Sequence, residues 1–207
     1  MTARENFRRA FAALLFLLLQ FSGHCAENTV GDSSKLIVRT VLPSDTDSRI
    51  DKSSGDGWEH YIYLNPSVPD RKQLLVFLPG TGGKGGGAKA FLSFAANQGF
   101  HVISLAYPSQ LSISAFRESP DPDAFLKARN NLIYGKPPFG RLNTGVPNSI
   151  QNRLHFLLHH LIEHFPQENW RQFMREGGKN FDYRTMILAG QSQGGGHAAL
   201  KIGRAHV

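Results

Sequence analysis

A serine lies between two glycines in segment 190–194 (GQSQG), which fits the pattern G-x-S-x-G. The preceding residues 185–189 (TMILA) have the composition of a buried strand, and the small residues 195–199 (GGHAA) could begin a helix. A serine at such a sharp turn projects its hydroxyl at the carboxyl edge of a sheet, beside helix N–H groups that can stabilise an oxyanion. Gly190 and Gly194 would let neighbouring backbone pass without a Cβ clash. The pattern predicts Ser192 as a nucleophile toward carbonyl carbon, and the alternative is a glycine-rich turn with an incidental serine.

A second glycine-rich stretch, residues 80–87, follows the apolar run LLVFL of Leu74–Leu78. Residues 80–85 match the dinucleotide pattern G-x-G-x-x-G, but no Asp or Glu lies between Asp70 and Glu118 to bind a ribose. A phosphate-binding P-loop also fails, because Leu78 replaces its first glycine and Gly85 replaces its Ser or Thr. We therefore expect no nucleotide cofactor here.

Histidines offer a third kind of chemistry, since His155, His159 and Glu163 are spaced by four residues and could hold a metal on one helix face. This face lies opposite a stripe of leucines, so a solvated polar face is the favoured interpretation, and no metal site is predicted. His160 and His164 are interpreted in the same way. His197, five residues beyond Ser192, is expected to pack into the scaffold or to form a hydrogen bond there.

The elements that must position these residues follow from local pattern. Strand composition occurs at residues 36–42, 60–64, 74–78, 102–106 and 185–189, and helical patterns at 88–98, 149–165 and near 123–132. The first helix carries apolar Phe91, Phe94 and Ala95, and residues 44–57 are expected to be a loop. The strand–helix–strand unit across residues 74–106 predicts a parallel pair of strands. An insertion at residues 107–147 contains six prolines and is expected at the edge of the sheet.

With these elements in place, the chain resembles the α/β-hydrolase superfamily, in particular secreted bacterial-type members with a G-x-S-Q-G-G-G-H-A elbow. Four features carry the resemblance, which spans roughly residues 60–199: the elbow 190–198, the segment 74–83 (LLVFLPGTGG), the following unit that ends in YP at 107–108, and the helix 149–165. The elbow is specific to the superfamily and not to a substrate.

The resemblance implies an α/β-hydrolase-like, mostly parallel sheet flanked by helices. It implies esterase- or lipase-like acyl transfer through Ser192 on a small-molecule or polymer ester, with no metal or organic cofactor. It also implies two oxyanion donors, the N–H of Gln193 and that of Thr81 or Gly82. The family usually has His-Gly before this second donor, whereas this chain has Pro79 and Gly80.

The remaining members of a catalytic triad should follow the serine in the order acid, then histidine. After Ser192 the sequence has no Asp or Glu, and its histidines are His197 and His206. The chain is therefore expected to lack an oriented general base, to be inactive as given, and to leave one side of its sheet open with apolar surface exposed. A non-catalytic α/β-hydrolase-like binding or scaffold protein is the second hypothesis.

Both ends of the chain indicate segments outside the folded domain. Residues 1–26 have a positive start, an apolar run at 10–19 and small residues before Glu27, which is typical of a signal peptide. Residues 202–207 (IGRAHV) match the translation of a widely used sequencing adapter, so an artefactual tail is expected over residues 201–207. The expected domain is thus a partial hydrolase over residues 27–200, secreted or periplasmic, with no membrane span after signal cleavage.

The net charge of +7 would suggest a nucleic-acid partner if it belonged to the folded domain. The signal segment carries +2 of it and the tail another +2, which leaves +3 without a clustered basic face. The sequence therefore favours no nucleic-acid partner. The single cysteine, Cys25, excludes a disulfide framework and a multi-cysteine metal site.

Overall fold

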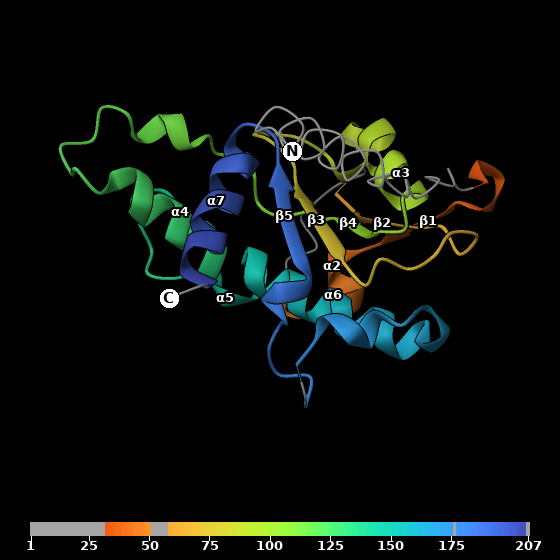
Figure 1. Cartoon of the computed structure of the whole chain (residues 1–207). Coiled ribbons are helices and arrows are strands. Elements are labelled where there is room, and N and C mark those ends of the chain that lie inside the picture. Colours follow the sequence, from red (N-terminus) through yellow and green to blue (C-terminus); the bar gives the residue numbers. More distant parts are fainter. Residues whose placement is uncertain (1–31, 51–57, 176, 206–207) are drawn as a thin grey trace, which may run out of the picture.

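The computed structural model describes residues 32–50, 58–175 and 177–205. Its centre is a mixed sheet of five strands in the order β1-β2-β4-β3-β5 (Figure 1). The strands are β1 (Ile37–Val41), β2 (His60–Leu64), β3 (Leu74–Leu78), β4 (His101–Ser104) and β5 (Met186–Gly190). The five predicted strands are confirmed, with boundaries that differ by no more than two residues. The expected signal peptide lies outside the described residues.

The sheet is mixed rather than mostly parallel in its pairings. Strand β3 pairs in parallel with β4 and β5, as the strand–helix–strand pattern predicts. Strand β2 is antiparallel to both of its neighbours, β1 and β4. Antiparallel neighbours need no helical crossover between them. In the described part of the connection from β1 to β2, the only helix is the short α2 (Pro43–Thr46). That helix corrects the expectation of a loop for residues 44–46, whereas residues 47–50 are non-helical as expected and residues 51–57 lie outside the described part.

Helices cover both faces of the sheet, and the side chains of β3 contact helices on each face. Leu74, Val76 and Leu78 lie in one apolar cluster with the leucines of α6 (Ile150–His164), whereas Leu75 and Phe77 lie in another with α3 (Lys89–Asn97). Because both faces are covered, every residue of β3 is buried, and its sequence is a continuous apolar run. Helix α6 confirms the strongest helical pattern in the sequence, and the Ser149 hydroxyl caps its first turn by accepting from the Asn152 N–H.

The buried face of α3 differs from the expected one. Leu92, Ala95 and Ala96 are buried, whereas Phe94 is 64% exposed and Phe91 is also exposed. Residues 92, 95 and 96 have the i, i+3, i+4 spacing of one helix face, and the two small side chains let the helix lie close to the sheet. The large phenylalanines lie on the flank of that face, where the Phe91 ring approaches that of Phe77 at 6.0 Å.

Strand β5 is an edge strand in the described part of the chain, because it pairs with β3 alone. None of its five residues is fully buried, and Ile187 is the most exposed at 37%. The sequence-based interpretation of this strand as buried is therefore wrong. Apolar composition alone does not distinguish a central strand from an edge strand.

The insertion after β4 packs beside the helix that follows β5. It contains η3 (Ile113–Phe116), α4 (Ala124–Tyr134) and α5 (Gly145–Asn148). Helix α4 confirms the short helix predicted near 123–132, and it contacts both α6 and α7 (Gln193–Ala205), as Figure 1 shows for α7. No helix in the described ranges is long and apolar enough to cross a membrane.

The link between α6 and β5 forms more core than its polar composition indicates. It contains η4 (Pro166–Glu168), η5 (Trp170–Phe173) and η6 (Tyr183–Thr185), and the rings of Trp170 and Phe173 pack edge-on against His101 of β4. Glu168 anchors the link, because its carboxylate accepts two hydrogen bonds from the Arg39 guanidinium, at 2.9 and 2.6 Å, and one from the Trp170 indole. A charge-assisted pair of this kind ties the link to β1.

Candidate active site

Ser192 occupies a tight turn between the end of β5 and the start of α7. Its φ is +52°, a left-handed conformation that residues with a Cβ rarely adopt. The turn is held by the Gln191 N–H, which donates to the Leu78 carbonyl at 3.1 Å, and by the Gly194 N–H, which donates to the Gln191 carbonyl at 2.9 Å. Ser192 is exposed, so a strained backbone presents it at the carboxyl edge of the sheet.

Glycines make this turn possible because backbone segments meet there. A Cβ at Gly194 would overlap the Leu78 carbonyl oxygen and would lie 2.5 Å from that of Pro79. A Cβ at Gly190 would lie 2.5 Å from the carbonyl carbon of Gly194. Both distances are far below van der Waals contact, so the sequence positions 190 and 194 require glycine for a steric reason.

The loop after β3 lies directly against the turn. A Cβ at Gly80 would be 3.4 Å from the Cβ of Ser192, and the absence of one leaves the loop backbone close to the serine. The Gly82 N–H donates to the Ser109 carbonyl at 3.0 Å and is therefore committed. An oxyanion donor from this loop would therefore be the N–H of Thr81 rather than that of Gly82. The N–H groups of Thr81 and Gln193, by contrast, have no hydrogen-bond acceptor among the described residues.

His197 packs into the scaffold, in agreement with its expected place. The residue is 0% exposed, its ring meets Tyr107 edge-on at 5.6 Å, and neither ring nitrogen has a hydrogen-bond partner in the described chain. Burial, and to a lesser extent the charge of Arg129, lowers the pKa of His197 to about 3. The ring is therefore neutral at ordinary pH and enclosed, so it does not serve as a solvent-facing base.

The four histidines of α6 form a partly exposed surface. The rings of His155 and His159 are 4.5 Å apart, and the His159 Nε2 lies 2.9 Å from the Gly178 carbonyl oxygen. His160 and His164 stack at 4.1 Å. Within the described ranges, no group of three or more His, Cys, Asp or Glu side chains could hold a metal ion.

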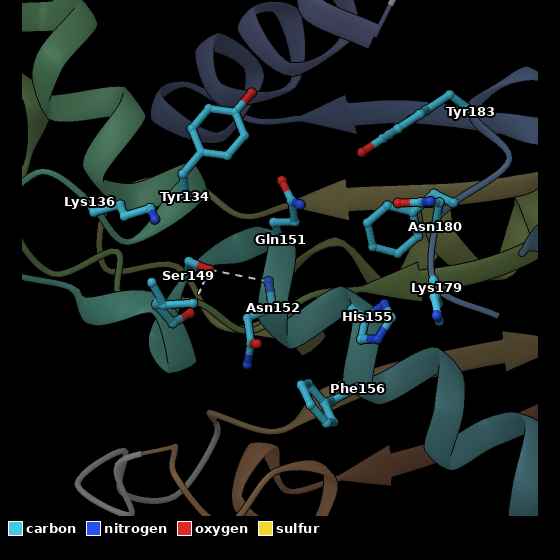
Figure 2. Close-up of a pocket in the computed structure, with 12 residues that line it drawn as sticks. Tyr134, Lys136, Ser149, Gln151, Asn152, His155, Phe156, Lys179, Asn180 and Tyr183 are labelled. Carbon is cyan, nitrogen blue, oxygen red and sulfur yellow. Dashed lines mark hydrogen bonds between the residues drawn. The ribbon is translucent and has the colours of Figure 1, made fainter. Parts of the chain in front are cut away.

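Two cavities lie elsewhere in the molecule. One, of about 490 Å³, lies beside α6 and is lined by the side chains drawn in Figure 2, where Tyr183 extends toward Gln151. The other, of about 480 Å³, lies near His101 and the end of β2. Neither of these two cavities is lined by Ser192, Thr81 or Gln193. Sequence patterns did not predict either cavity, because their lining comes from segments far apart in the chain.

Comparison with known proteins gives a distant structural likeness. No protein-family model and no curated protein matches the chain. A similar solved structure is that of esterase B from Lactobacillus rhamnosis, inhibited by a C4-C4 SN3 tributyrin phosphonate, with 14% sequence identity and a TM-score of 0.40. The alignment covers 97% of this chain and 50% of that enzyme, so the chain spans about half of its length. At this similarity, the function of the chain has to be argued from its own geometry.

Proposed function

We propose that the chain contains the nucleophile and oxyanion donors of a serine hydrolase that acts on carboxylic esters by acyl transfer. The observation that supports this proposal is Ser192 itself, exposed at a strand–helix turn with a φ of +52°. A strained conformation at an exposed polar residue is typical of functional sites. The N–H of Gln193 and that of Thr81 are available beside it, as an oxyanion requires.

In the proposed reaction, the Ser192 Oγ attacks the ester carbonyl carbon and loses its proton to a base. The carbonyl oxygen becomes an oxyanion, which the N–H groups of Gln193 and Thr81 and the N-terminal dipole of α7 stabilise. The C–O bond to the alcohol then breaks, the alcohol leaves with the proton, and an acyl-serine remains. Water hydrolyses that acyl-serine, which releases the acid and restores the hydroxyl.

The proposed reaction also needs a proton acceptor for the Ser192 hydroxyl. His197 is buried and neutral, and no Asp or Glu follows Ser192 in the sequence. We therefore propose that the triad acid and histidine lie outside this chain, so that the chain by itself is a weak catalyst. Export by residues 1–26 and an ester of small-molecule or polymer type belong to the same proposal.

The missing base also favours the second candidate function, a non-catalytic binding or scaffold protein with a hydrolase-like fold. In that case the turn at Ser192 would be a structural remnant, and its hydroxyl would react like that of any exposed serine. The two candidates differ in the reactivity of one oxygen atom, which can be measured directly.

A small fluorophosphonate is expected to label Ser192 selectively when imidazole is added as an external base. General-base assistance contributes about 10²–10⁴-fold to such reactions, and the preorganised donors act on the phosphoryl oxygen as they would on an oxyanion. At ~0.1 M imidazole we expect the labelling rate of Ser192 to rise by at least about tenfold. Mass spectrometry of the modified peptide measures that rate.

Two controls make the labelling decisive. Ser192→Ala should abolish the modification of its peptide, and the exposed Ser114 on η3 provides an internal reference in the same molecule. Labelling of Ser192 that is no faster than labelling of Ser114 would refute the hydrolase proposal and favour the binding protein.

A further inference from the structure

We propose that the side chain of Gln193 is a positioning residue, which holds the Thr81 N–H in place as an oxyanion donor. This inference rests on the proposed function, and it concerns the side chain of Gln193, whereas that function uses the backbone N–H of the same residue. Three segments far apart in the sequence meet at this side chain: the first turn of α7, the loop after β3, and the start of η3.

The Gln193 carboxamide oxygen accepts two hydrogen bonds. The Thr81 hydroxyl donates to Oε1 at 3.1 Å, and the Ile113 N–H donates to the same oxygen at 2.8 Å. Gln193 is only 5% exposed, so water competes little for these bonds. A single buried acceptor thus joins the donor loop to the insertion that flanks it.

The carboxamide nitrogen of Gln193 lies near Tyr107, which holds the loop after β3 from its other end. The Tyr107 hydroxyl donates to the Pro79 carbonyl at 2.6 Å and so holds the donor loop from its other end. The Gln193 amide is close enough to lower the pKa of Tyr107, although burial raises that pKa by more. The Gln193 Nε2 nevertheless has no hydrogen bond of normal geometry among the described residues. The Arg129 guanidinium donates to the Gln193 carbonyl at 3.1 Å, which fixes the residue to α4.

The position of the Thr81 N–H depends on these contacts. Thr81 is exposed, and Gly82 beside it has a φ of +65° with open space around it, so neighbouring side chains do not confine this part of the loop. Two hydrogen bonds hold the Thr81 N–H in place as tethers: the bond from the next residue's N–H, Gly82, to Ser109, and the bond from the Thr81 hydroxyl to Gln193. Because oxyanion stabilisation falls steeply when a donor is misplaced, loss of one tether should slow the reaction of Ser192.

Two substitutions separate positioning from packing. Gln193→Met keeps the length of the side chain and removes the acceptor, whereas Thr81→Val keeps the backbone N–H and removes the hydroxyl that is tethered. Each is expected to slow fluorophosphonate labelling of Ser192 in imidazole by about tenfold, because removal of one oxyanion-hole donor costs about 10²–10³ and displacement costs less. Gln172→Met is the matched control, since the Gln172 amide donates to Asp70 far from the site.

Amide hydrogen exchange reports the tether without any reaction at Ser192. The Ile113 N–H should exchange at least about tenfold faster in Gln193→Met than in the wild-type chain, while Gln172→Met leaves it unchanged. Gln193→Glu keeps an acceptor oxygen, so Ile113 should stay protected. Its negative charge beside the oxyanion should nevertheless slow labelling, for an electrostatic reason that is separate from the tether.

The outcomes distinguish this inference from the proposed function. If Ser192 is not labelled selectively in the wild-type chain, the proposed function is refuted. The positioning role of Gln193, which depends on it, is refuted as well. Selective wild-type labelling that is unchanged in both Gln193→Met and Thr81→Val overturns the positioning role alone, whatever Ile113 exchange shows. Should Gln193→Met fold poorly, Thr81→Val still decides, because Thr81 lies on an exposed loop.

Discussion

Replacing Gly194 by alanine is expected to lower the free energy of unfolding by roughly 3 kcal/mol or more, which is at the upper end for a single added methyl group. The new Cβ would overlap the Leu78 carbonyl oxygen and press on that of Pro79. Both atoms are backbone atoms at the end of β3, and β3 is hydrogen-bonded to β4 on one side and to β5 on the other. The clash therefore has to be relieved by moving the whole turn that carries Ser192.

The neighbouring Gly195 provides the matched control. A Cβ there would approach the Gly190 carbonyl oxygen at 3.1 Å, which is tight but can relax, and alanine is favoured over glycine in a helix by about 1 kcal/mol. Gly195→Ala should therefore change the stability by less than about 1 kcal/mol. Urea unfolding followed by circular dichroism measures both variants. Equal midpoints for the two would mean that the turn does not pack against β3 as tightly as the structure indicates.

Local sequence signals predicted the elements that hold the site. Continuous apolar or β-branched runs marked β3, β4 and β5, and the three- and four-residue spacing of leucines marked α6. These signals succeed because a buried strand and an amphipathic helix each impose their own period on the residues that contact the core. The turn at Ser192 was predictable for a similar reason, since its glycines are required within five residues of sequence.

What the sequence did not predict depends on contacts between distant segments. The exposure of β5 and the burial of Trp170 depend on which elements pack against them. A segment such as residues 166–173 does not show from its sequence alone that it will be buried. The face of α3 was predicted in part: Ala95 is buried as expected, whereas Phe91 and Phe94 are exposed and Leu92 and Ala96 are buried in their place. At the site, the bond from the Gly82 N–H to Ser109 and the bonds at the Gln193 side chain span 27 or more residues.

Acid is expected to destabilise the chain steeply below pH 6.5, because two buried histidines must gain protons when it unfolds. His60 and His197 are each 0% exposed. Burial lowers the pKa of His197 to about 3, and burial, with a smaller effect of Arg153, lowers that of His60 well below 6.5. The His60 Nδ1 also accepts the Ala106 N–H, a bond that requires the unprotonated nitrogen.

The sign of the effect follows from proton uptake. In the unfolded chain both rings titrate near 6.5, so below that pH the unfolded state binds more protons than the folded state. Their contribution to stability is fully present above pH 6.5 and is lost progressively as the pH falls, for His197 down to its folded pKa of about 3. Each ring contributes about 1.4 kcal/mol per pH unit, and the two together about 2.7 kcal/mol per unit. His155 and His160, whose pKa burial also lowers, act in the same direction.

The measurement is the free energy of urea unfolding between pH 7.5 and pH 4.5, as a function of pH in the wild-type chain and in His197→Phe. Phenylalanine keeps an aromatic ring against Tyr107 and removes two buried nitrogens that have no partner in the described residues, so we expect the variant to be at least as stable as the wild-type chain at pH 7. It should also lose about 1.4 kcal/mol per pH unit of the acid dependence. If the slope in His197→Phe equals that of the wild-type chain, His197 takes up its proton in the folded state as well. Its ring on α7 would then have to be accessible to solvent.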